Sequence, residues 1–263
     1  MSSCPELLDR LAPKEHVVQL YGSDDRLLTR NVGRFLEEGL KRGDGVLVIA
    51  TPEHRSSLAR SLRNQATYSS AVLAGRLVFL DAAVTLSRLL TDGVPDAELF
   101  DTVVGEALRS VRSNAGHTGV RAYGEMVGLL WKSGDSAAAT RLEELWNGFL
   151  RASDVSLFCA YPIDVFSPDF QSGNVDAVLS AHTHLLPVDI ALKDALNQAL
   201  EDVLGVSADD IRNLIESNDR PCSATIPPAE SMVLWLRTNL PISGAEILDR
   251  ARLYYQPLAA ERQ

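Results

Sequence analysis

Five short apolar segments spread over residues 17–160 constrain the fold more than any other feature of the sequence. They cover residues 17–21, 46–50, 77–80, 120–123 and 155–160. Most are almost continuously apolar instead of alternating with polar residues, which is typical of strands whose two faces are both covered. We therefore predict a buried sheet built from these five strands.

Amphipathic helix patterns fill the spaces between the strands. The clearest pattern covers residues 25–42, where one face carries Leu28, Val32, Phe35, Leu36 and Leu40. Further helices are predicted at residues 53–63, 96–114, 126–132 and 136–152. Strands that alternate with helices form βαβ units with right-handed crossovers. The predicted fold class is α/β, with a mainly parallel sheet flanked by helices.

The last third of the chain has only helical patterns. These predict helices at residues 169–181, 189–204, 208–217, 228–239 and 244–254. The stretch SNDRPCSATIPP, residues 217–228, has the composition of a linker. We expect an α/β domain over residues 14–185. A helical C-terminal region over residues 186–263 would then dimerise, dock a partner or pack on that domain.

Composition excludes several classes of protein. The formal net charge is −10, and an acidic surface repels nucleic-acid phosphates, so we expect no direct nucleic-acid binding. No apolar run approaches the roughly 18 residues of a membrane span, and residues 1–16 lack a signal-peptide pattern. We therefore expect a cytoplasmic protein with no membrane contact. The cysteines are too far apart for a disulfide framework or a metal knuckle: Cys4, Cys159 and Cys222.

The turn after the first predicted strand has the layout of a phosphate-binding loop but lacks its chemistry. In HVVQLYGSDDRLLTRN, residues 16–31, a strand runs through Gly22 into a helix. A working loop needs further glycines and a lysine for the terminal phosphates. Here Asp24 and Asp25 occupy the helix start, where they would repel a triphosphate. An alternative is that Arg26 and Arg30 replace the missing lysine.

Several segments together resemble a known family. FLEEGLKRGDGVLVIATPEHRSSLARSL is similar to the helix–strand–helix of KaiC-type, RecA-like ATPases. The segments HVVQLY, GRLVFLD, VRAYGEMVGLLW and LEELWNGFLRASDVSLFCAYP resemble the MEDS domain, the sensory domain of methanogen and methylotroph proteins, over roughly residues 14–185. The resemblance implies a RecA/KaiC-like fold without ATPase motifs that senses small molecules, often hydrocarbon derivatives. No DNA-binding or kinase output module follows that we recognise.

A ligand-binding site is expected where the strands end, because ligands of open α/β sheets bind beyond the carboxyl ends of the strands. The residues there are aromatic with a few polar groups, which suits a modest organic molecule better than a nucleotide. The candidate ligand-binding residues are Tyr21, Ser23, Asp81, Tyr123, Glu125, Trp131, Tyr161 and His16.

Structural alternatives stand beside these functional interpretations. Tyr21 and Tyr161 could be core residues, and Trp131 could pack a helix on the sheet. Asp81 could cap the next helix, and His16 could anchor the sheet edge. Glu125 follows a strand at the position of an ATPase acid or its neighbour. Glu143 and Asn147, one helical turn apart, read as structural.

Other chemistry finds little support in the sequence. His182 and His184 lack further ligands at a diagnostic spacing, so no metal is expected. No nucleophile motif or Ser/His/Asp set can be identified, so no catalytic residue and no cofactor is expected. Cys159 lies in an apolar run and reads as a buried thiol.

Three functional hypotheses follow. The first is a cytoplasmic, non-enzymatic sensory protein that binds a small organic effector and relays the signal to a partner protein, either a kinase or a transcription regulator. A homodimer is compatible with it. The second is a nucleotide-binding protein or ATPase relative with a non-standard phosphate loop. The third is a scaffold with no small ligand.

Overall fold

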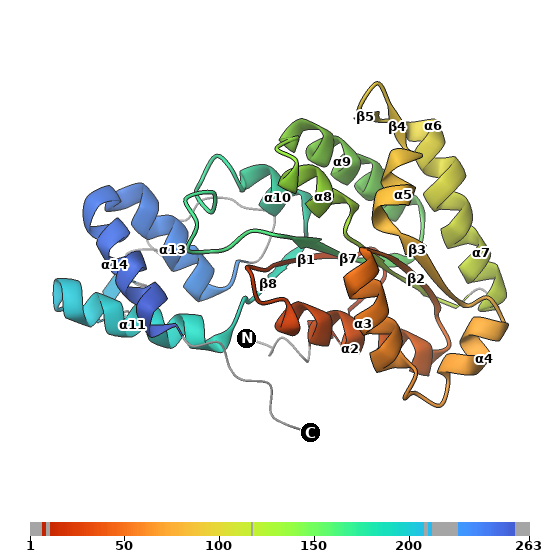
Figure 1. The fold of residues 1–263 in the computed structure, drawn as a ribbon, viewed down its shortest axis with the longest axis horizontal. Coiled ribbons are helices and arrows are strands. Elements are labelled where there is room, and N and C mark those ends of the chain that lie inside the picture. Colours follow the sequence, from red (N-terminus) through yellow and green to blue (C-terminus); the bar gives the residue numbers. More distant parts are fainter. Residues whose placement is uncertain (1–6, 9–10, 117, 208–209, 212–225, 256–263) are drawn as a thin grey trace. The chain divides into compact units, whose positions relative to one another are not determined.

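The computed structural model describes residues 7–8, 11–116, 118–207, 210–211 and 226–255, and Figure 1 shows their elements. The chain divides into two compact units. One comprises Met1–Val18 and Leu28–Pro162, and the other comprises Gln19–Leu27 and Ile163–Gln263. The expected boundary between residues 185 and 186 stays a prediction.

The first unit is organised around a sheet of buried strands. Its strands are β2 (Gly45–Ala50), β3 (Leu77–Asp81), β6 (Val120–Gly124), β7 (Val155–Tyr161) and the first three residues of β1 (His16–Leu20). They lie in the order β3-β2-β6-β7-β1, and β8 (His184–Leu186), which belongs to the second unit, is the sixth strand. The pairs β2–β3, β2–β6 and β6–β7 are parallel. The five predicted strands and the α/β fold class are therefore confirmed.

Helices cover both faces of this sheet. On one face α2 (Arg26–Arg42) packs through Phe35 against Phe158 of β7, with ring centroids 5.7 Å apart, and α3 (Pro52–Leu62) lies beside α2 (Figure 1). On the other face α8 (Met126–Lys132) approaches β7 closely at Gly128, and Trp146 of α9 (Ser136–Ala152) lies against Gly124. All residues of β2 and β7 are consequently buried.

The remaining elements of the first unit lie between β2 and β6 in sequence. They are α4 (Tyr68–Leu73), α5 (Ala82–Ser87), the hairpin of β4 (Leu90–Thr91) and β5 (Val94–Pro95), α6 (Ala97–Phe100), a π-helical turn at Asp101–Gly105, and α7 (Glu106–Asn114). The predicted helix at residues 96–114 is thus present but contains the π-helical turn. The helices α4 and α5 and the hairpin were not predicted.

The second unit is mainly helical. It contains α10 (Asp176–Ala181), β8, α11 (Ile190–Leu204), α13 (Pro228–Asn239) and α14 (Pro241–Tyr254). The predicted helix at residues 169–181 is wrong in its first half, because Gly173 has a φ of 93° and the helix begins only at Asp176. Of the predicted helix at 208–217 the structure describes only residues 210–211, which are helical, and most of the predicted linker at 217–228 lies outside the described residues.

The segment after β1 belongs to this second unit and contacts the residues that follow β7. A Cβ atom at Gly22 would lie 3.6 Å from the side chain of Asp164. Asp164 in turn accepts a hydrogen bond of 2.7 Å from Arg252 of α14. The loop after β1 is therefore connected to the C-terminal helices through one aspartate.

No helix in the described part of the chain has the length and apolar character that crossing a membrane would need.

Candidate functional site

The connections that follow β2 and β6, two neighbouring parallel strands, run toward opposite edges of the sheet. From β2 the chain crosses to β3 on one side, and from β6 it crosses to β7 on the opposite side. The loops that leave the carboxyl ends of β2 and β6 therefore diverge. A divergence of this kind creates the crevice in which open α/β sheets bind their ligands.

A buried carboxyl group occupies this position. Glu125 follows β6 directly and is 3% exposed. Its Oε2 accepts a 2.7 Å hydrogen bond from the backbone N–H of Thr51, at the end of β2, and its Oε1 accepts one of 2.5 Å from the Tyr123 hydroxyl. Oε1 also contacts Nδ1 of His54 in the first turns of α3. We call these four residues the Glu125 cluster.

The Glu125 cluster joins three elements at one carboxyl group. Each element contributes a different kind of contact: β2 a backbone N–H, β6 a phenol and α3 an imidazole. A buried carboxyl group is costly unless such partners compensate for the lost water. The cluster therefore fixes the ends of the two diverging strands relative to α3, and a ligand that competes for Glu125 would disturb all three.

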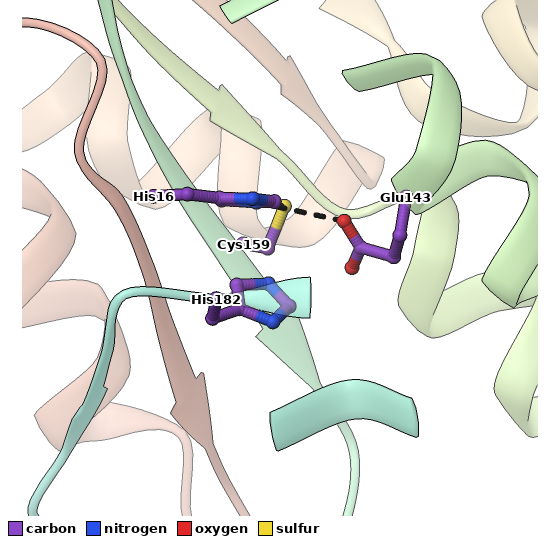
Figure 2. Close-up of side chains that lie close together, drawn as sticks. All are labelled: His16, Glu143, Cys159 and His182. Carbon is purple, nitrogen blue, oxygen red and sulfur yellow. Dashed lines mark hydrogen bonds and ion pairs between the residues drawn. The ribbon is translucent and has the colours of Figure 1, made fainter. Parts of the chain in front are cut away.

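A second polar cluster is buried on the opposite face of the sheet (Figure 2). Nε2 of His16 on β1 lies 3.2 Å from Sγ of Cys159 on β7 and 3.5 Å from Oε2 of Glu143 on α9. Around them, Asn147 Oδ1 lies 3.0 Å from His16 Nδ1, and the Tyr161 hydroxyl donates a 2.7 Å hydrogen bond to Glu143 Oε1. We call these five residues the His16 cluster.

Burial changes the proton affinities in the His16 cluster. It raises the pKa of Glu143 to about 8, although the hydrogen bond from Tyr161 acts in the opposite direction. Burial, with a smaller contribution from the Glu143 charge, raises the pKa of the Cys159 thiol well above its ordinary value. The same two causes, in the same order, raise the pKa of Tyr161. Cys159 is thus a buried thiol, as its sequence context predicts.

Two pairs among the predicted site residues come together, but not in one site. Tyr123 and Glu125 share the Glu125 cluster, whereas His16 and Tyr161 share the His16 cluster. Trp131 belongs beside the second pair, because its ring meets that of Tyr161 edge-on with centroids 5.8 Å apart. The single aromatic crevice expected from the sequence is therefore divided between the two faces of the sheet.

Asp81 has a structural role at the end of β3. Its carboxylate accepts a 3.0 Å hydrogen bond from the Val84 backbone N–H and caps α5. This is the capping alternative that its position suggested. Its other charged contact, with Arg55 of α3, is long at 3.9 Å.

Tyr21 and Ser23 belong to the second unit, in the loop after β1. Their expected proximity to Tyr123 and Glu125 stays a prediction. The helix start that follows is occupied by Asp24, which accepts a 3.1 Å hydrogen bond from the Arg26 backbone N–H. Asp24 also binds the Arg26 guanidinium through both oxygens, which lowers the pKa of this carboxyl.

Sequence reasoning missed His54 and favoured a structural role for Glu143 and Asn147 over a functional one. His54 follows Thr51-Pro52-Glu53, the predicted start of a helix at a strand end. Its place just after a strand end could have indicated that it lies near the site. Glu143 and Asn147 come from a helix remote in sequence from His16. Their one-turn spacing on one helix face was the only indication that they could act together.

The fold and these clusters define a parallel α/β protein with buried polar groups where its strands and helices meet. The chain belongs to the MEDS family, the methanogen/methylotroph, DcmR sensory domain, whose family model matches residues 15–183. That match includes every residue of both clusters and confirms the resemblance seen in the sequence. A search among curated proteins found no match.

Proposed function

We propose that this protein is a sensory module that binds a small organic effector beside Glu125, at the carboxyl ends of β2 and β6. The observation that carries the proposal is the buried carboxyl group at the divergence of two strand connections, in a chain that belongs to a sensory-domain family. An uncharged effector with one hydrogen-bonding group could replace the Tyr123 or Thr51 contact to Glu125 while its apolar part packs on the aromatic side chains.

The phosphate loop supports an organic effector rather than a nucleotide. We infer a RecA/KaiC-like domain that has lost nucleotide binding, because Arg26, a substitute for the missing lysine, is engaged by Asp24 through both carboxylate oxygens. A triphosphate would have to displace this carboxylate and would meet the negative charge of Asp25 as well.

The C-terminal helices are the proposed route to a partner protein, a kinase or a transcription regulator in the cytoplasm. Their connection to the loop after β1 runs through Asp164, which contacts both Gly22 and Arg252 within the second unit. A shift of that loop would change the environment of α14. The same proposal includes a homodimer as an assembly in which these helices could act.

The test is a thermal-shift and calorimetric screen of the full chain against short alcohols, aldehydes, carboxylates and halogenated methanes. We expect at least one class to bind. Glu125→Gln should weaken it, Tyr123→Phe should strengthen it by removing the hydroxyl that competes for Glu125, and the exposed Glu144→Gln should do neither. Binding of ATP with Mg²⁺ at a Kd below about 100 μM, roughly 5.5 kcal/mol of affinity, with phosphate release would overturn the proposal. Equal binding by all three variants would show that the effector does not bind beside Glu125.

A further inference from the structure

The His16 cluster combines three side chains that are common ligands of transition metals. An imidazole, a thiol and a carboxyl group place one donor atom each, Nε2 of His16, Sγ of Cys159 and Oε2 of Glu143, within 4.8 Å of one another. Histidine, cysteine and glutamate are all residue types that bind zinc in proteins. Figure 2 shows the three side chains converging from two strands and a helix.

The distances suit a shared ion. With metal–ligand bonds of about 2.0–2.3 Å and tetrahedral angles, two donors of one zinc ion lie roughly 3.3–3.8 Å apart. His16 Nε2 lies 3.2 Å from Cys159 Sγ and 3.5 Å from Glu143 Oε2. Both distances from His16 Nε2 are therefore close to those of a shared ion, and the remaining donor pair, Cys159 and Glu143, lies within 4.8 Å.

The surrounding contacts orient these donors as metal sites require. Asn147 Oδ1, 3.0 Å from His16 Nδ1, accepts its proton and so keeps Nε2 as the lone-pair nitrogen facing Cys159 and Glu143. The Tyr161 hydroxyl holds the other oxygen of Glu143, Oε1, and so directs Oε2 toward the histidine. Partners of this kind, which fix the tautomer and the carboxylate orientation, accompany the ligands of most metal sites.

Charge balance favours a divalent ion in this interior. The three donor residues are at most 2% exposed, so any net charge there is expensive. When a divalent ion binds, Cys159 and Glu143 each release one proton to solvent, and His16 stays neutral. The thiolate and the carboxylate then cancel the two positive charges of the ion.

We propose that His16, Glu143 and Cys159 form a binding site for one divalent transition-metal ion, with zinc as the ion that fits their chemistry best. The three donors of the first unit leave one position of a tetrahedral zinc ion for a further ligand. This site is independent of the proposed effector site, since the Glu125 cluster shares no residue with it.

The first experiment measures the metal content of the full, untagged chain after refolding with Zn²⁺ and removal of excess ion. We expect about one zinc ion per chain, and a clear reduction for Glu143→Gln and Cys159→Ser. Glu230→Gln is the matched control, because Glu230 is equally buried but lies in the second unit. Asn147→Ala should weaken binding by about 10–100-fold through loss of ligand orientation.

The second experiment identifies the sulfur ligand without changing the cluster. In the double variant Cys4→Ser/Cys222→Ser, Cys159 is the remaining thiol of the chain. Refolding it with Co²⁺ should give a thiolate-to-cobalt charge-transfer band and the strong visible absorption of tetrahedral cobalt. The site would be ruled out if this variant gave no such band, or if zinc content were the same in wild type and in a folded Cys159→Ser protein.

Discussion

Phe158 and Cys159, neighbours on β7, point to opposite faces of the sheet and serve different groups of residues. Phe158 packs edge-on against Tyr123, with ring centroids 5.8 Å apart, and so lies on the face of the Glu125 cluster. Cys159 contacts His16 and lies on the face of α9. The two-residue period of a strand thus separates two polar clusters by the thickness of one sheet.

Glu125→Gln should lower the free energy of unfolding by about 1–3 kcal/mol. The amide NH₂ of glutamine is itself a donor, so one of the groups that now donates to Glu125 would lose its acceptor. The affected donors are the Thr51 N–H and the Tyr123 hydroxyl. Urea unfolding measures the loss. Glu144→Gln is the control: its side chain is 60% exposed and pairs with Arg141, so a change within about 0.5 kcal/mol is expected. Equal effects of both substitutions would contradict the structural role of Glu125.

Glu230 should make stability depend on pH. Burial raises its pKa from 4.5 to about 7, although its Oε1 accepts a 2.6 Å hydrogen bond from the Val188 N–H. Because the folded state holds the proton more tightly than the unfolded state, this contribution is complete below the unfolded pKa. It disappears as pH rises through the folded pKa, so the free energy of unfolding falls between about pH 4.5 and 7.

The variant Glu230→Gln removes this titration. Relative to it, the wild-type free energy of unfolding should decrease by up to about 3 kcal/mol between pH 5 and pH 8. Urea unfolding at the two pH values measures the difference. Glu246→Gln, at an exposed position of α14, keeps Glu230 and should show the same decrease as the wild type. If the free energy of unfolding changed equally with pH in the wild type and in Glu230→Gln, Glu230 would not hold a proton in the folded state.

Two glycines of neighbouring helices should respond in opposite directions to alanine. At Gly128 of α8 an added Cβ would lie 2.6 Å from the carbonyl oxygen of Ala160 in β7, so Gly128→Ala should cost about 1–3 kcal/mol. At Gly148 of α9 the nearest atom would be 3.9 Å away, on the flexible end of Arg151. Gly148→Ala should therefore stabilise the helix by about 0.5–1 kcal/mol. Thermal unfolding of the two variants provides the comparison, and a stable Gly128→Ala protein would refute the close packing of α8 on β7.

Arg121→Met should destabilise the first unit by about 2–4 kcal/mol, because it leaves buried acceptors without their donor. The Arg121 guanidinium donates to the carbonyl oxygens of Leu8 and Phe35 and lies 3.5 Å from Asp44. Chemical denaturation tests this. Arg109→Met is the matched substitution at a position that is 52% exposed, where a change below about 0.5 kcal/mol is expected. A similar loss at both positions would argue against the buried contacts.

Continuous apolar runs made the strands predictable, and regular helix faces made the long helices predictable. The predicted helix at 136–152 has the bounds of α9. The elements that were missed are short: α4 and α5 have six residues each and β8 has three. In segments of that length, periodicity cannot separate a helix from a strand or a loop.

The candidate sites show the same limit at the level of side chains. Residues that follow strands, such as Tyr123 and Glu125, could be located because parallel strands end at one edge. Residues that reach a cluster from a helix could not. His54 and Glu143 are positioned by the packing of their helices on the sheet, and the sequence does not reveal the geometry of that packing. The face of β7 on which each cluster lies depends on the strand register.

The contact between Gly22 and Asp164 also has a consequence for biosynthesis. The second unit contains Gln19–Leu27, which are synthesised early, and Ile163–Gln263, which are synthesised after the strands of the first unit. The loop after β1 must therefore wait for Asp164, its partner about 140 residues later. The nascent chain is expected to carry this loop without its native contacts until Asp164 has left the ribosome, although the entropic cost of closing so long a loop rises only slowly with its length.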